Sequence, residues 1–343
     1  MKRIIQVILI VMCLASWGFA DDIFISAVMD DNQILTILSN VPKKKFSRRE
    51  FAALEKTAEE LVKEKRLNIA KEIYLRLLGT SPSKKRRFNF NMALGDIEMA
   101  SGYPQRAMQY YNVAQTLYPK NVHALIQEGD LLIAANILDL AQENFQKVLK
   151  LDKNSDIAKK RLGDIFFKQN MYVKALEYYQ RVRRNAFDRD LLINMLLCYR
   201  RLGQPQKVLD LADLHLEFSN EAYVHFIVGL AYFDLENFTQ AKQELLLSAN
   251  LDPENFVPYL YLAQVALREN DLQGAKGFLA KAQNISHSSV ASIDFMFAQI
   301  YYKQGMLASA KKYAQSAIVK AQDNQSFIAA VCRKLIELID RGG

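Results

Sequence analysis

The chain has 343 residues, of which 50% are apolar and 24% are charged, and its formal net charge is +8. An apolar content of one half is ample for a hydrophobic core. The mild positive net charge does not indicate any particular class of partner. A length of this kind normally indicates about two domains, but the repeated pattern described below overrides that expectation.

Residues 1–20 have the features of a bacterial secretory signal. Lys2 and Arg3 form a basic start, the run from Ile4 to Trp17 is almost wholly apolar, and small residues precede the acidic pair at 21–22. The apolar run is shorter than the roughly 20 residues that span a bilayer comfortably. We therefore expect cleavage after Ala20 and a periplasmic protein. Two alternatives stay open: an uncleaved inner-membrane anchor, and a lipoprotein modified at Cys13.

Residues 21–46 precede the repeats and are predicted to form one short helix and a basic linker. The next stretch, Ser47-Arg48-Arg49-Glu50, has the spacing of a capping box, in which the Ser hydroxyl and the Glu carboxylate each accept from a backbone N–H. This spacing predicts that a helix starts there.

From that point pairs of positions recur, and the two members of a pair lie twelve residues apart. Both members are Gly or Ala in every pair except the fifth, which has Leu196 and Val208 instead. The first positions are Ala58, Gly95, Gly129, Gly163, Leu196, Gly229, Ala263 and Ala298, and the second are Ala70, Ala107, Ala141, Ala175, Val208, Ala241, Ala275 and Ala310. Two antiparallel helices can pack closely only where neither carries a large side chain at the crossing. Large residues four places later, such as Tyr111, Phe145 and Leu245, are expected to fill the space beside it.

Turn residues agree with this division into helix pairs. Left-handed conformations are predicted at the end of the first helix in six repeats, at Gly102, Asn136, Asn170, Gly203, Asn270 and Gly305. Pro104 and Pro205 are placed to open a second helix, where the missing N–H costs nothing.

This pattern resembles the tetratricopeptide repeat, with its 34-residue motif of Leu-Gly-x2-Tyr, Ala-x3-Phe and a closing Pro. The third repeat keeps Ala141-x3-Phe145, and the sixth keeps Val228-Gly229-x2-Tyr232. The resemblance implies an all-α fold: a right-handed α-solenoid of about eight helix pairs over residues 47–324. Residues 325–343 are predicted to form a capping helix, because they have an apolar pattern without a partner helix.

The resemblance also implies that the first helices line a concave groove. Asp96, Asp130 and Asp164 directly follow the glycine of three successive repeats and form a predicted acidic ladder. Aromatic and apolar groove residues follow at Tyr223, Phe226, Leu230, Phe233, Leu260, Leu267, Phe295 and Tyr302. Such a groove predicts a protein or peptide ligand with a basic end and an apolar end. The alternative is that the aspartates are solvated or paired within the chain, and that the aromatic residues pack against the next repeat.

Basic residues gather at Lys84-Lys85-Arg86-Arg87. No nucleic acid partner is expected for an exported protein, so the functional interpretation of this basic surface is contact with an anionic membrane or glycan. The alternative interpretation is a solvated linker between helices.

Signals of catalysis and of metal binding are missing from the sequence. The four histidines lie in different repeats, and no Cys-x2-Cys pair, nucleophile elbow or phosphate loop is present. Cys198 and Cys332 fall about four repeats apart, so no disulfide is expected. We expect no enzymatic activity, no cofactor and no metal.

Together these features predict a non-enzymatic periplasmic scaffold or adaptor, which binds a peptide or helix in its groove during envelope assembly or secretion. The alternative is a component of exopolysaccharide export or cell-wall machinery, whose basic surface contacts an anionic polymer or membrane.

Overall fold

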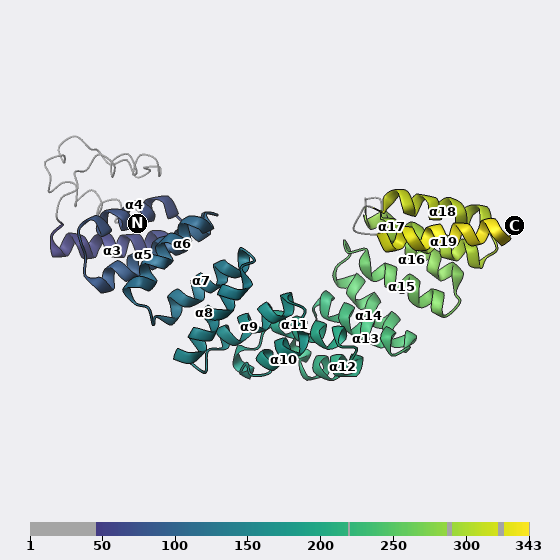
Figure 1. The fold of residues 1–343 in the computed structure, drawn as a ribbon, viewed down its shortest axis with the longest axis horizontal. Helices are drawn as coiled ribbons and strands as arrows, with labels where there is room; N and C mark the ends of the chain where they lie inside the picture. Colours follow the sequence, from purple (N-terminus) through teal and green to yellow (C-terminus); the bar gives the residue numbers. More distant parts are fainter. Residues whose placement is uncertain (1–45, 219, 287–289, 322–325, 343) are drawn as a thin grey trace. The chain divides into compact units, whose positions relative to one another are not determined.

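The computed structural model describes residues 46–342, apart from 219, 287–289 and 322–325. These residues form seventeen α-helices and two short 3₁₀ helices, and no β-strand occurs among them (Figure 1). The prediction of an all-helical fold built from helix pairs is therefore confirmed. The predicted signal, and all but the last residue of the predicted N-terminal helix and linker, lie outside the described residues.

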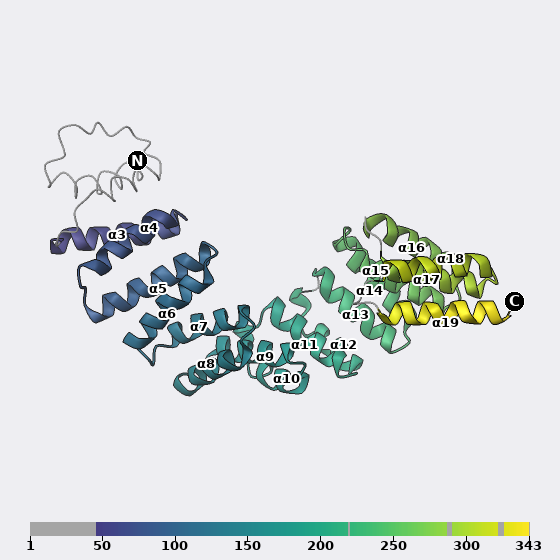
Figure 2. The same cartoon turned by 45° about the horizontal axis from the view of Figure 1, so that its top comes forward.

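The chain divides into two compact units, Met1–Ile165 and Phe166–Gly343. In unit 1 consecutive helices pack as pairs, α3 on α4, α5 on α6 and α7 on α8, and neighbouring pairs touch through α4 and α5 and through α6 and α7 (Figure 2). The helices are α3 (Arg48–Lys63), α4 (Leu67–Gly79), α5 (Lys84–Ala100), α6 (Pro104–Leu117), α7 (Val122–Ala134) and α8 (Leu138–Leu151), and α9 (Asp156–Lys168) crosses the division between the units.

Unit 2 is likewise built from pairs of consecutive helices. Its elements are α10 (Tyr172–Tyr179), 3₁₀ helix η1 (Arg184–Ala186), α11 (Arg189–Arg201), α12 (Pro205–Leu214), 3₁₀ helix η2 (Leu216–Phe218), α13 (Ala222–Asp234), α14 (Phe238–Leu251), α15 (Val257–Arg268), α16 (Leu272–Ser286), α17 (Ala291–Lys303), α18 (Leu307–Lys320) and α19 (Ser326–Gly342). The first helices of successive repeats also touch, α13 with both α11 and α15. They therefore form a continuous layer within this unit.

Helix ends follow the local signals in the sequence. Ser47 caps α3 with the complete capping box: the backbone N–H of Glu50 donates to its hydroxyl, and the Glu50 carboxylate accepts from the Ser47 N–H. All six predicted left-handed residues have positive φ, with values between 59° at Asn136 and 82° at Gly102. Pro104 and Pro205 stand in the first turns of α6 and α12. These predictions are confirmed.

The close helix approaches depend on glycine. A Cβ added at Gly129 would lie 2.6 Å from Cζ of Phe145, and one at Gly229 would lie 2.9 Å from Cγ of Leu245. Phe145 and Leu245 are fully buried at these crossings. The glycines thus let the second helix bring a large side chain against the backbone of the first, as the repeated spacing predicts.

Helix α19 packs on α18 and also touches α17. Its buried face includes Ala329 and Cys332, and Cys332 belongs to a cluster with Ala314 and Ala317 of α18. Helix α19 therefore covers the last helix pair of unit 2. No helix in the described part of the chain combines the length and the apolar character that crossing a membrane requires.

Candidate binding groove

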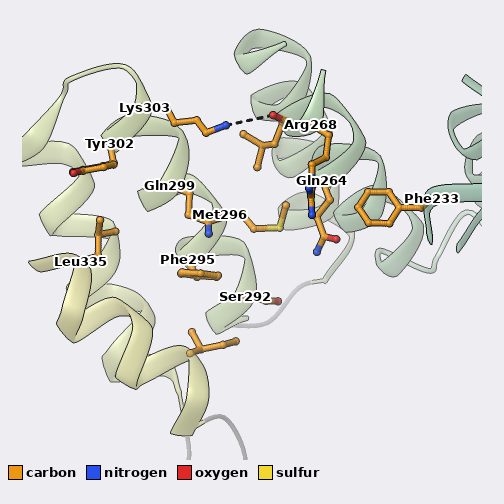
Figure 3. A pocket seen from close by; sticks show the side chains of 12 residues that line it. Phe233, Gln264, Arg268, Ser292, Phe295, Met296, Gln299, Tyr302, Lys303 and Leu335 are labelled. Atoms are coloured by element: carbon orange, nitrogen blue, oxygen red, sulfur yellow. Dashed lines mark hydrogen bonds between the residues drawn. The ribbon is translucent and has the colours of Figure 1, made fainter. Parts of the chain in front are cut away.

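Unit 2 contains a cavity of about 670 Å³, which is lined by twelve residues of α13, α15, α17 and α19 (Figure 3). Three of these elements are first helices of repeats, so the cavity lies on the layer that they form. Helix α19 supplies the opposite wall, and Figure 3 shows Leu335 on it, across the cavity from Gln264 and Arg268 of α15. The cavity is referred to below as the α15–α17 groove.

The walls of the α15–α17 groove are mainly apolar. Phe295 and Met296 of α17 lie at its centre in Figure 3. The apolar and aromatic lining residues are Phe233, Leu267, Phe295, Met296, Tyr302, Ile328 and Leu335. A concave apolar surface with a few polar groups is the usual form of a binding site.

Polar groups in the groove come from equivalent places in two repeats. Gln264 directly follows Ala263, and Gln299 directly follows Ala298, so both occupy the place that Asp96 and its two counterparts hold in unit 1. Each amide offers both donors and an acceptor. Hydrogen bonding to a peptide group from two successive repeats is therefore available.

Two cations border the groove. Arg268 and Lys303 stand five places after Ala263 and Ala298, again at equivalent positions of two repeats. The Lys303 ammonium donates to the carbonyl oxygen of Leu267 over 3.4 Å, and the Arg268 guanidinium lies 5.9 Å from the centre of the Phe233 ring. No acidic side chain is among the twelve lining residues.

The predicted groove residues of unit 2 fall into three groups. Phe233, Phe295 and Tyr302 line the cavity, as does Leu267. Tyr223 is 44% exposed and stacks on Phe226, whose ring meets Tyr261 edge-on at 5.4 Å. Leu260 is half-buried against the core around α16 and α17.

Leu230 is the exception among these residues. It is only 3% exposed. The prediction that Leu230 faces a ligand is therefore wrong. Phe226 packs on Tyr261 of the next repeat, as the alternative interpretation expects for an aromatic residue.

The predicted acidic ladder in unit 1 consists of carboxylates that already have partners. The Tyr111 hydroxyl donates to Oδ1 of Asp96 over 2.6 Å. Arg161 donates through Nε to Oδ1 of Asp130 over 2.5 Å and through Nη2 to its Oδ2 over 3.3 Å, and its Nη1 lies 3.6 Å from Oδ2 of Asp164. The aspartates therefore tie helices together, and their role toward a ligand stays a prediction.

These contacts shift the pKa values of the partners. Burial, followed by the hydrogen bond to Asp96, raises the pKa of Tyr111. The hydrogen bond to Asp130 raises the pKa of Arg161, and the charges of Asp130 and Asp164 add to the shift. Arg161 therefore remains a cation that holds two carboxylates of neighbouring repeats together.

The basic residues 84–87 form the first turn of α5, after the N-cap residue Ser83. Arg86 pairs with Glu55 over 3.1 Å and lies over the Phe51 ring, while Lys84 lies over the Tyr118 ring. Lys85 and Arg87 are exposed. Four cations thus occupy the positive end of a helix dipole, where positive charge is unfavourable.

Two of the described histidines contact neighbouring side chains, and both described cysteines are buried. His225 contacts Oε2 of Glu244 at 2.6 Å, and the ring of His215 stacks on Phe187 with 4.0 Å between centroids. Cys198 and Cys332 are fully buried, which agrees with the interpretation of Cys198 as a small core residue. Within the part of the chain that the structure describes, no group of His, Cys, Asp and Glu is arranged to hold a metal ion.

Several groove residues were not predicted from the sequence. Gln264, Gln299, Arg268 and Lys303 could have been found, because each pair recurs at an equivalent place in repeats seven and eight. Ile328 and Leu335 gave no such signal. They belong to α19, and a helix that covers the end of a repeat stack is not expected to line the groove.

The paired helices, the small residues at their crossings and the groove on the first-helix layer define an α-helical repeat protein of the class that binds other proteins. Residues 126–188 and 222–255 match two family models, both described as tetratricopeptide repeat. The chain therefore contains tetratricopeptide repeats in these two segments. Proteins of the tetratricopeptide repeat superfamily act as interaction scaffolds and are generally not enzymes.

Curated relatives are much longer than this chain. It is 21% identical over 227 residues to "Tetratricopeptide repeat protein 21A" of Mus musculus, which covers 62% of this chain and 17% of that protein. It is 23% identical over 163 residues to "Anaphase-promoting complex subunit CDC16" of Saccharomyces cerevisiae, with coverages of 45% and 19%. The chain thus spans less than a fifth of either relative.

Similar solved structures are also tetratricopeptide repeat proteins. One is YrrB, described as "a TPR protein with an unusual peptide-binding site", with 20% identity, a TM-score of 0.45 and coverages of 51% of this chain and 91% of YrrB. Another, from Parabacteroides merdae, has 13% identity, a TM-score of 0.40 and coverages of 84% and 98%.

Proposed function

We propose that this protein is a non-enzymatic scaffold that binds a peptide or helix of a protein partner in the α15–α17 groove. The observation that carries the proposal is the cavity itself: two successive repeats and α19 surround an apolar surface and supply two amides and two cations at its edge. A peptide needs these features, because its side chains require apolar contact and its backbone requires hydrogen-bond partners. Its proposed setting is the periplasm, in envelope assembly or secretion, and the support for that setting is the signal-like sequence of residues 1–20.

Site-specific photocrosslinking in cells tests the binding site. A photoreactive residue at Phe295 or Tyr302 should form an adduct with one and the same protein, identified by mass spectrometry. The matched control is a photoreactive residue at Leu247, which is exposed on α14 and does not line the groove. A second variant, Leu335→Arg, should abolish the adduct because it places a cation on the apolar wall. Equal crosslinking from Leu247, or adducts that persist in Leu335→Arg, would contradict the proposal.

The periplasmic setting has a separate test. The mass of the purified protein should correspond to a chain that begins at Asp21, and the protein should be released with the periplasmic fraction. An intact N-terminus with membrane retention would favour the anchored alternative, and a mass increase by a lipid at Cys13 would favour the lipoprotein.

A second candidate function is contact with an anionic polymer or membrane, as in exopolysaccharide export or cell-wall machinery. One specific observation favours it: four cations stand at the positive end of α5, and the side chains of Lys85 and Arg87 are exposed there. An anion at this place would relieve the unfavourable charge and accept from free backbone N–H groups.

Binding to vesicles that contain phosphatidylglycerol, and to an anionic polysaccharide, tests this second function. The double variant Lys85→Glu with Arg87→Glu should reduce binding, and binding should weaken steeply with salt. The double variant Lys150→Glu with Lys153→Glu is the matched control, because it makes the same change of net charge at other exposed residues of unit 1. Equal loss in both double variants would show a general charge effect and would remove the assignment to residues 84–87.

A further inference from the structure

The charged side chains that line the α15–α17 groove are all positive. Among the twelve described lining residues, Arg268 and Lys303 are the only ionisable ones other than Tyr302, and both are cations. In the described part of the chain neither forms an ion pair with a carboxylate. Their contacts are with the Phe233 ring and with the Leu267 carbonyl oxygen, which are neutral groups. Among the residues that the structure describes, no carboxylate therefore neutralises the positive charge at this edge.

Two arginines elsewhere in the protein are paired with carboxylates. Arg161 in unit 1 is held by Asp130 and Asp164, and Arg200 in unit 2 lies 3.5 Å from Asp234. The same chain therefore supplies carboxylates to arginines on its first helices. At the α15–α17 groove the equivalent carboxylates are missing from the lining, and the place that holds Asp in unit 1 holds Gln264 and Gln299.

The apolar walls narrow the chemistry of the ligand further. Phe295, Ile328 and Leu335 present aromatic and aliphatic surface to the cavity. A polysaccharide or a phosphate group offers little that matches such walls, whereas leucine, isoleucine, methionine or phenylalanine side chains of a peptide do. Gln264 and Gln299 can each donate to and accept from the backbone of that peptide.

We propose that the α15–α17 groove takes a peptide segment in which an acidic side chain stands among large apolar side chains. The carboxylate lies between Arg268 and Lys303, and the apolar side chains lie against Phe295, Ile328 and Leu335. This inference rests on the proposed function of peptide binding and adds the charge of the ligand. It differs from the expectation of a basic ligand end, which was drawn from the aspartates of unit 1.

Selection from a phage-displayed library of random peptides on the full chain tests the inference. The selected peptides should be enriched in Asp or Glu close to Leu, Ile, Met or Phe, and they should not bind the Leu335→Arg variant. The double variant Arg268→Glu with Lys303→Glu should select peptides with Lys or Arg in place of the acidic residues, because it reverses the charge at the groove edge.

Synthetic copies of a selected peptide measure how much its carboxylate contributes to affinity. They are acetylated and amidated so that no terminal charge remains. Replacing its Glu by Gln should weaken binding about fivefold, and Arg268→Gln or Lys303→Gln should each do the same, as expected for solvent-exposed charge pairs. Lys312→Gln is the matched control: it removes an exposed lysine of α18 outside the groove and should leave the affinity unchanged.

The outcomes separate the inference from the proposed function. Peptides that bind through Leu335 but show no excess of acidic residues, or that bind the charge-reversed double variant equally well, overturn the inference and leave peptide binding intact. Recovery of no peptide that depends on Leu335 overturns both. Binding of an anionic polysaccharide at the groove as tightly as the acidic peptide also overturns the inference.

Discussion

The hydroxyl group of Tyr111 donates a hydrogen bond to Oδ1 of Asp96, with 2.6 Å between the two oxygen atoms. Tyr111 is the large residue that fills the crossing of α5 and α6 beside Gly95, and its ring is fully buried. Asp96 is exposed, yet it is the acceptor that the buried tyrosine requires. Asp96, which the sequence analysis assigned to the groove, therefore has a structural role.

A double-mutant cycle on this pair measures that role. Tyr111→Phe should lower the free energy of unfolding by about 1 kcal/mol, because a hydrogen bond to a carboxylate is lost while the ring still fills the crossing. In the background of Asp96→Ala the same substitution should have a much smaller effect. Urea unfolding followed by circular dichroism gives the four values. Additive effects would show that the contact contributes nothing.

Arg161 should stabilise unit 1 in a salt-dependent way. Its contact with Asp130 joins two repeats, and its contact with Asp164 lies within α9. The groups are partly exposed, so the expected contribution is about 0.5–1 kcal/mol at low salt. Arg161→Met should remove it. Arg161→Lys should have an intermediate effect, since lysine keeps the charge but not the two-pronged geometry. Urea unfolding at low and high salt checks this, and a salt-independent loss would contradict it.

Gly129 is needed for the crossing of α7 and α8. Gly129→Ala forces the new Cβ to within 2.6 Å of the Phe145 ring, and the resulting displacement should cost about 1–3 kcal/mol of stability. Gly79→Ala is the control in the same unit, because no atom lies within 4 Å of its added Cβ. If the two substitutions lower the melting temperature equally, close packing at Gly129 is not the cause.

Tyr74 should make unit 1 sensitive to alkaline pH. Burial raises its pKa to about 12, and the charges of Glu59 and Glu55 contribute to the shift. Because this folded-state pKa lies above the value of about 10 in the unfolded chain, stability is fully present below pH 10 and is lost as the pH rises toward 12. The loss should reach about 3 kcal/mol.

Comparison with Tyr74→Phe isolates this effect from the titration of lysines, which occurs in the same range. Above pH 10 the unfolding free energy of the original protein should fall relative to that of Tyr74→Phe. Tyr103→Phe is the control, because it removes the hydroxyl group of a tyrosine that is 50% exposed. An unchanged difference up to pH 12 would show that Tyr74 ionises freely.

The groove shows where prediction from sequence is limited. Phe295 and Leu230 both stood in the predicted apolar surface, but Phe295 lines the cavity and Leu230 is buried. Their repeat positions differ by only a few places, and the exposure of each depends on how closely the neighbouring helices approach. The distance between neighbouring helices is set by how their side chains pack together. It cannot be inferred from the residue pattern of a single repeat.

By itself the sequence determined the helix pairs, their boundaries and their closest contacts. Glycine at a crossing, a left-handed residue such as Asn136 at a helix end and the Ser47 capping box each act within a few residues or one repeat, so local spacing reveals them. The tertiary structure alone decided the partners of the aspartates and the walls of the groove. Arg161 reaches Asp130 across 31 residues, and α19 brings Leu335 opposite α15, because packing joins residues that the sequence keeps apart.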